Sequence, residues 1–174
     1  FKDIILIMTI KLIIIKKVNI SKNWIEWLND TDITKFSENR FKKHTKSTQI
    51  KFLQKKLKDK NSILFKIFFK NENIEILELS NINYVHKTCE ISYMIGKKLF
   101  WNKGIGSSSV SKGLDYAFKK LLMQKICAGT YENNLGSIKV LKNNGFKKEG
   151  KIKNFFKFSK SKRVSKIVFG ISKS

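Results

Sequence analysis

The sequence predicts a single α+β domain built around one mixed, mostly antiparallel sheet flanked by helices. Stretches with strand-like patterns come in runs, and helix-like stretches separate these runs instead of alternating with single strands. The chain has 174 residues, 41% of them hydrophobic, which is enough to bury one core. No Pro/Ser-rich linker and no internal repeat divides it.

The first strand is expected over residues 9–18, "TIKLIIIKKV". The apolar runs at this end are short and Lys11 interrupts them, so they fall below the roughly 20 residues that a membrane-spanning helix needs. Because Met8 is the first methionine, residues 1–7 are interpreted as upstream translation or as a disordered segment. The domain is therefore expected to cover residues 9–172, in the cytoplasm and without a membrane partner.

Two helices are predicted next. Residues 19–36 are expected to form a short helix with Ser21 as its cap. Its apolar side chains share one face: Trp24, Trp27 and Leu28. Residues 47–57 form the second helix. Its apolar side chains also recur at helical spacing: Ile50, Leu53 and Leu57.

Three strands follow. The β-rich runs 62–69 and 74–80 are joined by Lys70-Asn71-Glu72-Asn73, which indicates a hairpin. A third strand over 88–96 leads into a glycine-containing loop. Beyond that loop, an amphipathic helix is predicted from its apolar positions: Val110, Leu114, Phe118, Leu121 and Leu122.

The last third of the chain is expected to contain a strand, a helix and then two final strands. A strand is expected over 125–132 and a compact helix over 133–146. Gly145 stands where a left-handed cap is wanted at the end of that helix. The final strands are expected over 151–158 and 163–171.

The loop "FWNKGIGSSSV", residues 100–110, carries the main functional signal. Gly104 and Gly106 can adopt backbone angles closed to other residues and let a ligand approach the main chain. A helix that starts just after them directs unpaired N–H groups and the positive end of its dipole at that ligand, which favours a phosphate. The spacing is not that of a P-loop, and Ser109 stands where a dinucleotide-binding loop has its third glycine.

The wider context resembles the GNAT family, the GCN5-related N-acetyltransferases. The resemblance rests on the loop Lys103-Gly104-Ile105-Gly106 and on four later positions: Asn134, Ser137, Gly145 and Phe146. It is strong over residues 90–150 and weaker in the first half of the chain. Trp101 directly precedes Asn102-Lys103-Gly104-Ile105-Gly106, and with it the sequence most resembles the branch of ribosomal-protein and nucleotide-amino-sugar acetyltransferases.

The resemblance implies acetyl-CoA as cosubstrate and direct acetyl transfer to an amine in a ternary complex. The loop N–H groups would hold the pyrophosphate: Asn102, Lys103, Gly104, Ile105, Gly106 and Ser107. The main chain of the preceding strand would hold the pantetheine arm: Tyr93, Met94 and Ile95. An N–H near Met94 would stabilise the oxyanion. Asn134 matches a cofactor-contacting position, with a simple helix-cap role as the alternative.

The catalytic roles carry over only in part. Glu90 lies where many relatives have a carboxylate that removes the proton of the amine. Leu141 occupies the position of the tyrosine that protonates the leaving thiolate in many relatives, so Ser137 or a water must replace it. Arg40, one of only two arginines, is a candidate for binding a phosphate or carboxylate of the acceptor, or for pairing with Glu38.

The acceptor is expected to be a small amine, such as a nucleotide-linked amino sugar, or a protein N-terminus. The net charge of +24 also suggests a non-catalytic nucleic-acid-binding domain. Lysines spread along the whole chain and the scarcity of G/C-coded residues argue instead for codon bias. A degenerate domain that only binds acyl-CoA is the third hypothesis. No metal is expected: two Cys lie far apart, and His44 and His86, without spaced partners, are interpreted as surface-loop residues.

Overall fold

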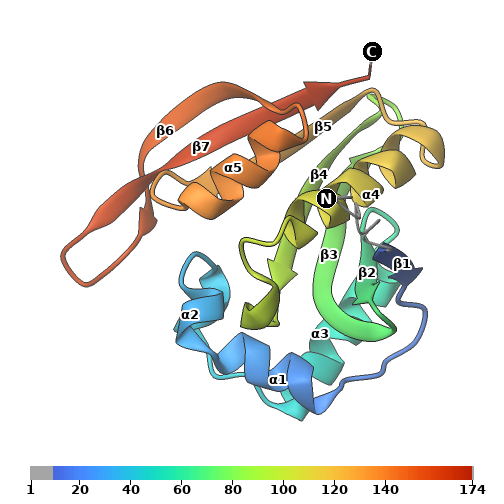
Figure 1. Ribbon diagram of the computed structural model, residues 1–174, viewed down its shortest axis with the longest axis vertical. Coiled ribbons are helices and arrows are strands. Elements are labelled where there is room, and N and C mark those ends of the chain that lie inside the picture. Colours follow the sequence, from blue (N-terminus) through green and yellow to red (C-terminus); the bar gives the residue numbers. More distant parts are fainter. Residues whose placement is uncertain (1–9, 174) are drawn as a thin grey trace, which may run out of the picture.

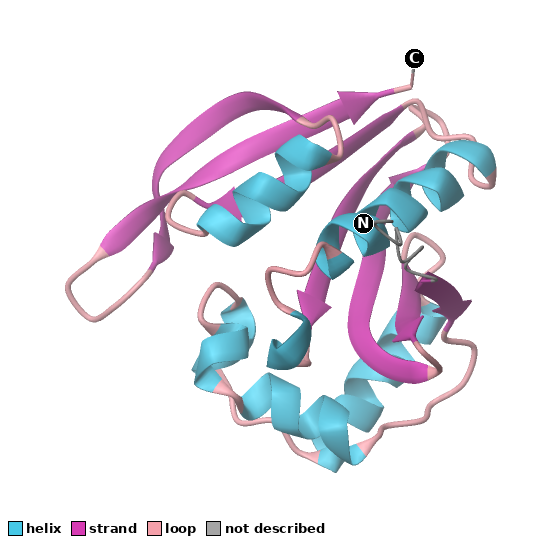
Figure 2. Cartoon of the chain, in the orientation of Figure 1, coloured by secondary structure: helices cyan, strands magenta, loops and turns pink. Residues whose placement is uncertain are grey.

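The computed structural model describes residues 10–173 of the chain. Residues 1–7, expected to be upstream translation or disordered, and Thr9, the expected start of the first strand, lie outside this range. Within it, the chain folds into one seven-stranded sheet with helices on both faces (Figures 1 and 2). This confirms the predicted α+β fold class.

The sheet has the strand order β1-β2-β3-β4-β5-β7-β6. Every neighbouring pair is antiparallel except β4 and β5. The bounds of the strands are β1 Ile10–Ile14, β2 Ile63–Phe69, β3 Glu72–Asn83, β4 Thr88–Ile95, β5 Lys125–Tyr131, β6 Lys147–Lys157 and β7 Arg163–Ser172. The hairpin predicted around residues 70–73 joins β2 to β3, with Lys70 and Asn71 at φ values of 48° and 62°.

The helices and short 3-10 turns connect these strands. Their bounds are α1 Lys22–Asn29, α2 Thr31–Thr34, η1 Glu38–Phe41, α3 Lys46–Lys58, η2 Lys98–Phe100, α4 Ile105–Lys119 and α5 Leu135–Asn143. Helix α4 crosses the sheet over β1, β3 and β4, and α5 lies beside β5 (Figure 1). Helix α3 packs on β2.

The helix predicted over residues 19–36 is in fact two helices. Ser21 caps α1 as predicted, accepting a hydrogen bond from the Trp24 N–H at 3.2 Å. Asp30 then leaves the helical conformation, at φ −82° and ψ 119°, and its carboxylate accepts hydrogen bonds from the N–H groups of Asp32 and Ile33. A carboxylate is a strong cap for a new helix, so the chain restarts as α2 at this point.

Three smaller predictions also need correction. The first strand ends at Ile14, well short of residue 18. Helix α3 buries Gln49 and Leu53, and Leu57 on the predicted apolar face is exposed. Helix α4 ends at Lys119, so Leu122 lies beyond it in a turn with φ 57°. In the first and third cases local apolar spacing continued beyond the end of the element, and in the second an apolar residue inside the helix does not reach the core.

The sheet separates two apolar cores because alternate side chains of a strand point to opposite faces. The larger core, with Phe65, Leu77 and Ile91, packs under α4 and α5. The smaller core on the other face joins α1 and α3 to the strands: Ile15, Trp24, Leu28, Leu53 and Leu64. Trp24 and Trp27, which the sequence places on one apolar helix face, are both buried.

Candidate functional site

A cleft opens where β4 and β5 diverge. The two strands pair only at Thr88, Cys89 and Glu90, and beyond these positions they move apart (Figure 1). The cleft has a volume of about 1300 Å³, and residues 91–95 of β4 and 128–131 of β5 line its two sides. Its other walls come from the glycine loop, from α5 and from the α1–α3 region. Parallel strands that separate in this way leave main-chain groups available to a ligand between them.

The glycine loop forms one end of the cleft, as the sequence predicts. Gly104 precedes α4 with φ 77°, a left-handed conformation that favours glycine. Trp101 fixes the loop to the end of β4 through its indole N–H, which donates to the Ile95 carbonyl at 3.1 Å. The first N–H groups of a 15-residue helix therefore face the cleft without intrahelical partners.

The sequence suggests that Gly106 adopts an unusual backbone angle, but in the structure its role is close packing. It is buried within the first turn of α4 and has no positive φ. A Cβ at this position would lie 2.8 Å from Cδ1 of Ile95 and 3.5 Å from the Tyr93 ring. Gly106 therefore lets the start of the helix lie close against β4, whereas Gly104 supplies the unusual backbone angle.

Most of the predicted cofactor-binding residues come together around the cleft. Those that line it are Tyr93, Met94, Ile95, Asn102, Gly104, Gly106, Ser107 and Asn134. Two do not line it: the Ile105 side chain is in the core and the Lys103 side chain is exposed. For these two residues, the predicted contact with the pyrophosphate can come only from the backbone N–H groups.

Asn134 and Ser107 have structural partners as well as cleft positions. The Asn134 side-chain oxygen Oδ1 accepts a hydrogen bond from the Ser137 N–H at 3.2 Å and so caps α5. The side-chain nitrogen Nδ2 remains for a ligand. The Ser107 hydroxyl and carbonyl accept hydrogen bonds from Asn144 at 3.0 and 3.1 Å, which ties the start of α4 to the end of α5.

The predicted catalytic residues are separated. Ser137 lines the cleft, and so does the buried side chain of Leu141. Glu90 does not line it; its carboxylate is exposed and accepts a hydrogen bond from Asn81 at 3.1 Å. Glu90 is the last residue at which β4 still pairs with β5, so it precedes the opening. Ser92, which follows it on the same face of β4, does line the cleft.

The far side of the cleft contains a pair that the sequence analysis missed. The Tyr131 hydroxyl, at the end of β5, donates a hydrogen bond to the Glu38 carboxylate of η1 at 3.2 Å. The Tyr131 ring is buried and stacks on Phe156 with centroids 3.8 Å apart. Burial, and then the charge of Glu38, raises the pKa of Tyr131 to about 12, so its hydroxyl remains protonated near neutral pH.

Arg40 has a structural role beside this pair. Its guanidinium donates hydrogen bonds to the carbonyls of Lys35 at 2.6 Å and Lys157 at 2.5 Å. It also lies over the rings of Tyr131 and Phe158, at 5.6 and 5.2 Å from their centroids. Arg40 therefore joins the η1 region to the end of β6. No ion pair with Glu38 is found among residues 10–173.

His44 is buried, and the prediction that it lies in a surface loop was wrong. One ring nitrogen lies 2.9 Å from the Asn39 carbonyl, and the other lies 3.0 Å from the Gln49 amide nitrogen. The Gln49 side-chain oxygen Oε1 in turn accepts a hydrogen bond from the Trp24 indole N–H at 3.1 Å. This chain of polar contacts fixes the wall between α1 and α3. In residues 10–173, no cluster of three or more His, Cys, Asp or Glu side chains could hold a metal ion.

Glu132, directly after β5, ties the end of this strand to β6 and β7. Its protonation at acid pH is expected to weaken these contacts. Glu132 forms an ion pair with Lys151 at 2.6 Å and accepts a hydrogen bond from the Ser165 N–H at 2.7 Å. These contacts lower the pKa of Glu132 from its usual value of 4.5 to about 2, and the hydrogen bond from Lys151 has the largest effect. The ionised form therefore stabilises the fold above pH 4.5, and this contribution is lost as the pH falls towards 2.

We accordingly expect Glu132→Gln to lower the unfolding midpoint in urea at pH 7 and to have little effect near pH 2. Denaturation curves at several pH values would measure this difference. Glu26→Gln is the control, because Glu26 only forms an exposed pair with Lys22 on α1, of a kind that contributes little. A Glu132→Gln deficit that is the same at every pH would contradict the assignment.

No helix within residues 10–173 is long and apolar enough to cross a membrane.

A family model described as an acetyltransferase (GNAT) domain matches residues 15–147. The chain is 30% identical over 105 residues to the uncharacterized N-acetyltransferase p20 of Bacillus licheniformis, a match that covers 59% of this chain and 58% of that protein. It is 25% identical over 134 residues to the acetyltransferase PseH of Campylobacter jejuni, covering 75% of this chain and 79% of PseH.

Among solved structures, the spermidine N-acetyltransferase of Vibrio cholerae in complex with CoA and spermine superimposes with a TM-score of 0.78. The two chains are 19% identical, and the match covers 94% of this chain and 95% of that one. At this identity the likeness concerns the fold.

Proposed function

This chain belongs to the acetyltransferase (GNAT) domain family, and on that premise we propose that it transfers an acetyl group from acetyl-CoA to a primary amine. One observation carries the proposal: the cleft between the diverging strands β4 and β5 ends at the glycine-preceded N-terminus of α4. An extended thioester with a pyrophosphate at one end suits such a cleft, because the helix N-terminus favours the negative charge of the pyrophosphate.

The cofactor is assigned to the β4 side of the cleft. The N–H groups of residues 102–107 bind the pyrophosphate, supported by the dipole of α4. The pantetheine arm lies along Tyr93, Met94 and Ile95, in the place that a paired strand would occupy. Asn134 adds a contact through the amide nitrogen that its capping role leaves available. The position of these residues around one cleft supports this assignment.

The reaction is assigned to the part of the cleft beside Met94, beyond the point where the strands separate. A main-chain N–H near Met94 stabilises the oxyanion as the amine attacks the thioester carbonyl. Holding both reactants in one cleft makes the attack effectively unimolecular, which is a large part of the benefit. Ser137, or a water beside it, protonates the leaving thiolate, because Leu141 has no hydroxyl to do so.

The acceptor is proposed to be a primary amine on a molecule that also carries negative charge, such as a nucleotide-linked amino sugar, with a protein N-terminus as the second class. Lys35, Lys42 and Lys43 line the α2–α3 side of the cleft and could contact an anionic group. The assignment to the branch of ribosomal-protein and amino-sugar acetyltransferases is part of the same proposal. Arg40 holds the η1 side of the cleft in place by donating hydrogen bonds to the main-chain carbonyls of Lys35 and Lys157. Any contact between Arg40 and the acceptor is proposed to be made from this position.

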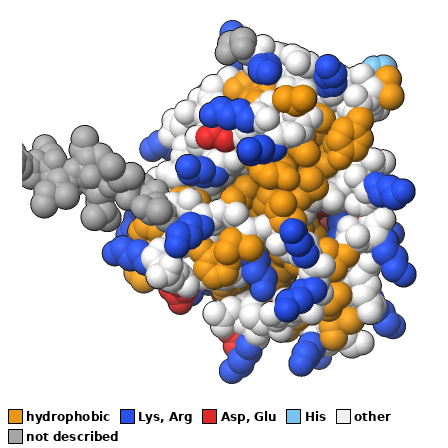
Figure 3. All heavy atoms as spheres, turned by 90° about the vertical axis from the view of Figure 1, so that its right-hand side faces the viewer, with side chains coloured by type: hydrophobic (Ala, Val, Ile, Leu, Met, Phe, Trp, Pro, Cys, Tyr) orange, Lys and Arg blue, Asp and Glu red, His pale blue; other side chains and the backbone are white. Residues whose placement is uncertain are grey.

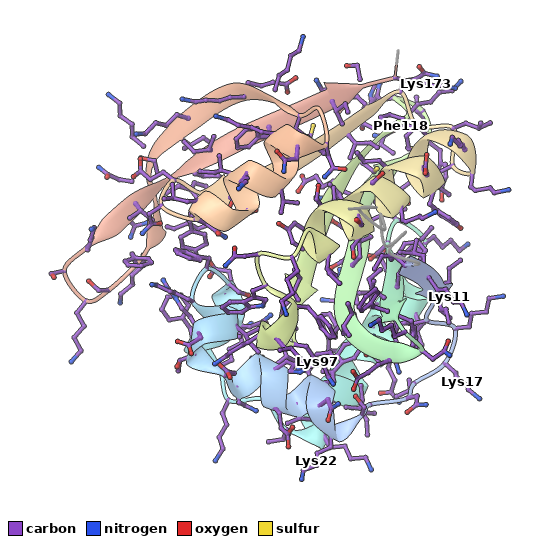
Figure 4. All side chains as sticks on the ribbon, viewed as in Figure 1. Lys11, Lys17, Lys22, Lys97, Phe118 and Lys173 are labelled. Atoms are coloured by element: carbon purple, nitrogen blue, oxygen red, sulfur yellow. The ribbon has the colours of Figure 1, made fainter. Side chains whose placement is uncertain are left out.

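The nucleic-acid-binding alternative is less well supported, because exposed lysines lie on many elements instead of along a single one. Lys11, Lys17, Lys22 and Lys173 project from different parts of the molecule (Figure 4). On the face that Figure 3 shows, basic side chains are interspersed with apolar ones. A binding surface for a polyanion would concentrate them along one groove or stripe.

Thermal unfolding with acetyl-CoA, free CoA or heparin as a polyanion control tests the proposal. We expect acetyl-CoA to raise the melting temperature far more than heparin, by an amount equivalent to about 2.7 kcal/mol at 100 times the dissociation constant. Equal shifts with heparin would favour a general polyanion surface. Binding of acetyl-CoA without release of CoA in the presence of any amine would favour a degenerate acyl-CoA-binding domain.

A further inference from the structure

Three carboxylates line the cleft, and two of them are neutralised by lysines. Asp32 contacts Lys98 at 2.6 Å. Glu78 contacts Lys56 at 2.5 Å and also accepts a hydrogen bond from a serine hydroxyl at 2.8 Å. Glu38 differs, since within residues 10–173 it forms no ion pair with a lysine or arginine. A carboxylate without a cationic partner is the one best able to take a proton from an ammonium group.

Glu38 is held at the edge of the cleft by a neutral donor. The Tyr131 hydroxyl bonds one carboxylate oxygen at 3.2 Å, which leaves the second oxygen for a ligand. Tyr131 belongs to β5, one of the two strands that form the cleft, so the hydrogen bond spans from the sheet to η1. Phe156 stacks on one side of the Tyr131 ring, and Phe36 lies 5.8 Å from it. The Tyr131 ring is therefore packed between aromatic neighbours, and its hydroxyl orients the Glu38 carboxylate.

The segment that carries Glu38 is also fixed from both ends. Ser37 caps η1, and its hydroxyl accepts a hydrogen bond from the Asn39 N–H at 3.2 Å. Arg40, two residues after Glu38, ties the segment to the Lys35 carbonyl and to the Lys157 carbonyl of β6. In Figure 1 the α2–η1 region accordingly lies opposite the ends of β5 and β6. Precise placement of this kind is what a proton acceptor requires.

We propose that Glu38 is the base that accepts the proton of the acceptor's ammonium group, with Tyr131 as its positioning residue. The inference rests on the proposed acetyl transfer. The ammonium gives one proton to Glu38 and becomes a free amine, whose lone pair attacks the thioester carbonyl. The C–N bond forms, the C–S bond breaks, and the sulfur leaves with the electron pair. The nitrogen then loses its second proton, which reaches the thiolate through Ser137 or the water beside it, and Glu38 returns its proton to water.

Glu90 is the competing candidate, and the geometry separates the two. Glu90 lies before the point where the strands open, and its carboxylate contacts Asn81 on β3. Glu38 lines the cleft itself. Both side chains reach solvent, so each can be changed to glutamine with the same small change in shape. The pair Glu38→Gln and Glu90→Gln is therefore a matched comparison.

The experiment measures CoA release by wild type, Glu38→Gln, Glu90→Gln and Tyr131→Phe between pH 6 and pH 10. The acceptors are a uridine-diphosphate-linked amino sugar, a short peptide with a free N-terminus, and spermidine. We expect Glu38→Gln to lower kcat by about 100-fold at neutral pH. Its rate should recover as the pH approaches the pKa of the amine, because the free amine needs no base. Glu90→Gln should stay within about twofold of wild type.

Tyr131→Phe distinguishes positioning from a merely structural role. We expect kcat to fall by about tenfold while the acid side of the pH profile is retained, because Glu38 is still present but less well placed. The melting temperature of each variant with and without acetyl-CoA shows that the fold and the cofactor site are intact. A variant that keeps the acetyl-CoA shift but loses turnover is defective in chemistry.

The outcomes are distinct. A loss of turnover in Glu38→Gln alone, recovered at high pH, supports the assignment. Wild-type rates in Glu38→Gln, or a loss confined to Glu90→Gln, overturn it and leave the acetyltransferase proposal standing. If the wild-type protein releases no CoA with any of the three amines, the proposed function fails and the assignment of Glu38 fails with it.

Discussion

Replacing Gly96 with alanine is expected to destabilise the fold by about 3 kcal/mol, because the new methyl group has no room. A Cβ at this position would lie 1.9 to 2.4 Å from three ring carbons of Trp27. The Trp27 ring is itself buried, so it cannot move aside into solvent. Gly96 directly follows β4, and its N–H donates to the Ile74 carbonyl at 2.9 Å. The clash therefore strains the strand end that leads into the glycine loop.

Urea unfolding monitored by tryptophan fluorescence would measure this loss. Gly136→Ala is the matched control: in α5 its Cβ would meet only the Asn134 side-chain oxygen, at 3.9 Å. Alanine is favoured over glycine in a helix by up to about 1 kcal/mol, so the control should be unchanged or slightly more stable. If the two variants unfold at the same urea concentration, the close contact between Gly96 and Trp27 does not exist in solution.

Leu53→Ala is expected to cost between about 2 and 5 kcal/mol of unfolding free energy. Leu53 is fully buried in the smaller core, where it joins α3 to Trp24, Leu28 and Leu64. Removing its side chain leaves a cavity under the wall that Trp24 and its polar partners form. We also expect weaker acceptor binding, because Trp24, Leu28 and Leu64 line the cleft.

The same substitution at an exposed position provides the control. Leu135 begins α5 and is 74% exposed, so Leu135→Ala should change the unfolding free energy by less than about 0.5 kcal/mol. Chemical denaturation of both variants gives the comparison directly. Similar losses for the two leucines would mean that α3 does not pack on the sheet as the structure has it.

The cofactor side of the cleft could be predicted largely from the sequence. The strand over 88–96, the glycine loop and the helix after it are consecutive, so residues that meet in space are also near one another in the chain. The acceptor side could not be predicted in this way. Glu38 and Tyr131 are 93 positions apart, and neither belongs to a recognisable motif. Nothing in the sequence indicates that η1 lies against the end of β5.

The sequence by itself determined the order of the strands and of the longer helices, the cap at Ser21, the left-handed Gly145 and the loop at Gly104. These features depend on interactions within a few residues, which periodicity and capping preferences express. Only the tertiary structure decided which carboxylates face the cleft, that Arg40 binds backbone carbonyls, and that Gly106 is needed for close packing. Those outcomes depend on how segments far apart in the chain pack together, and local sequence patterns carry no information about that packing.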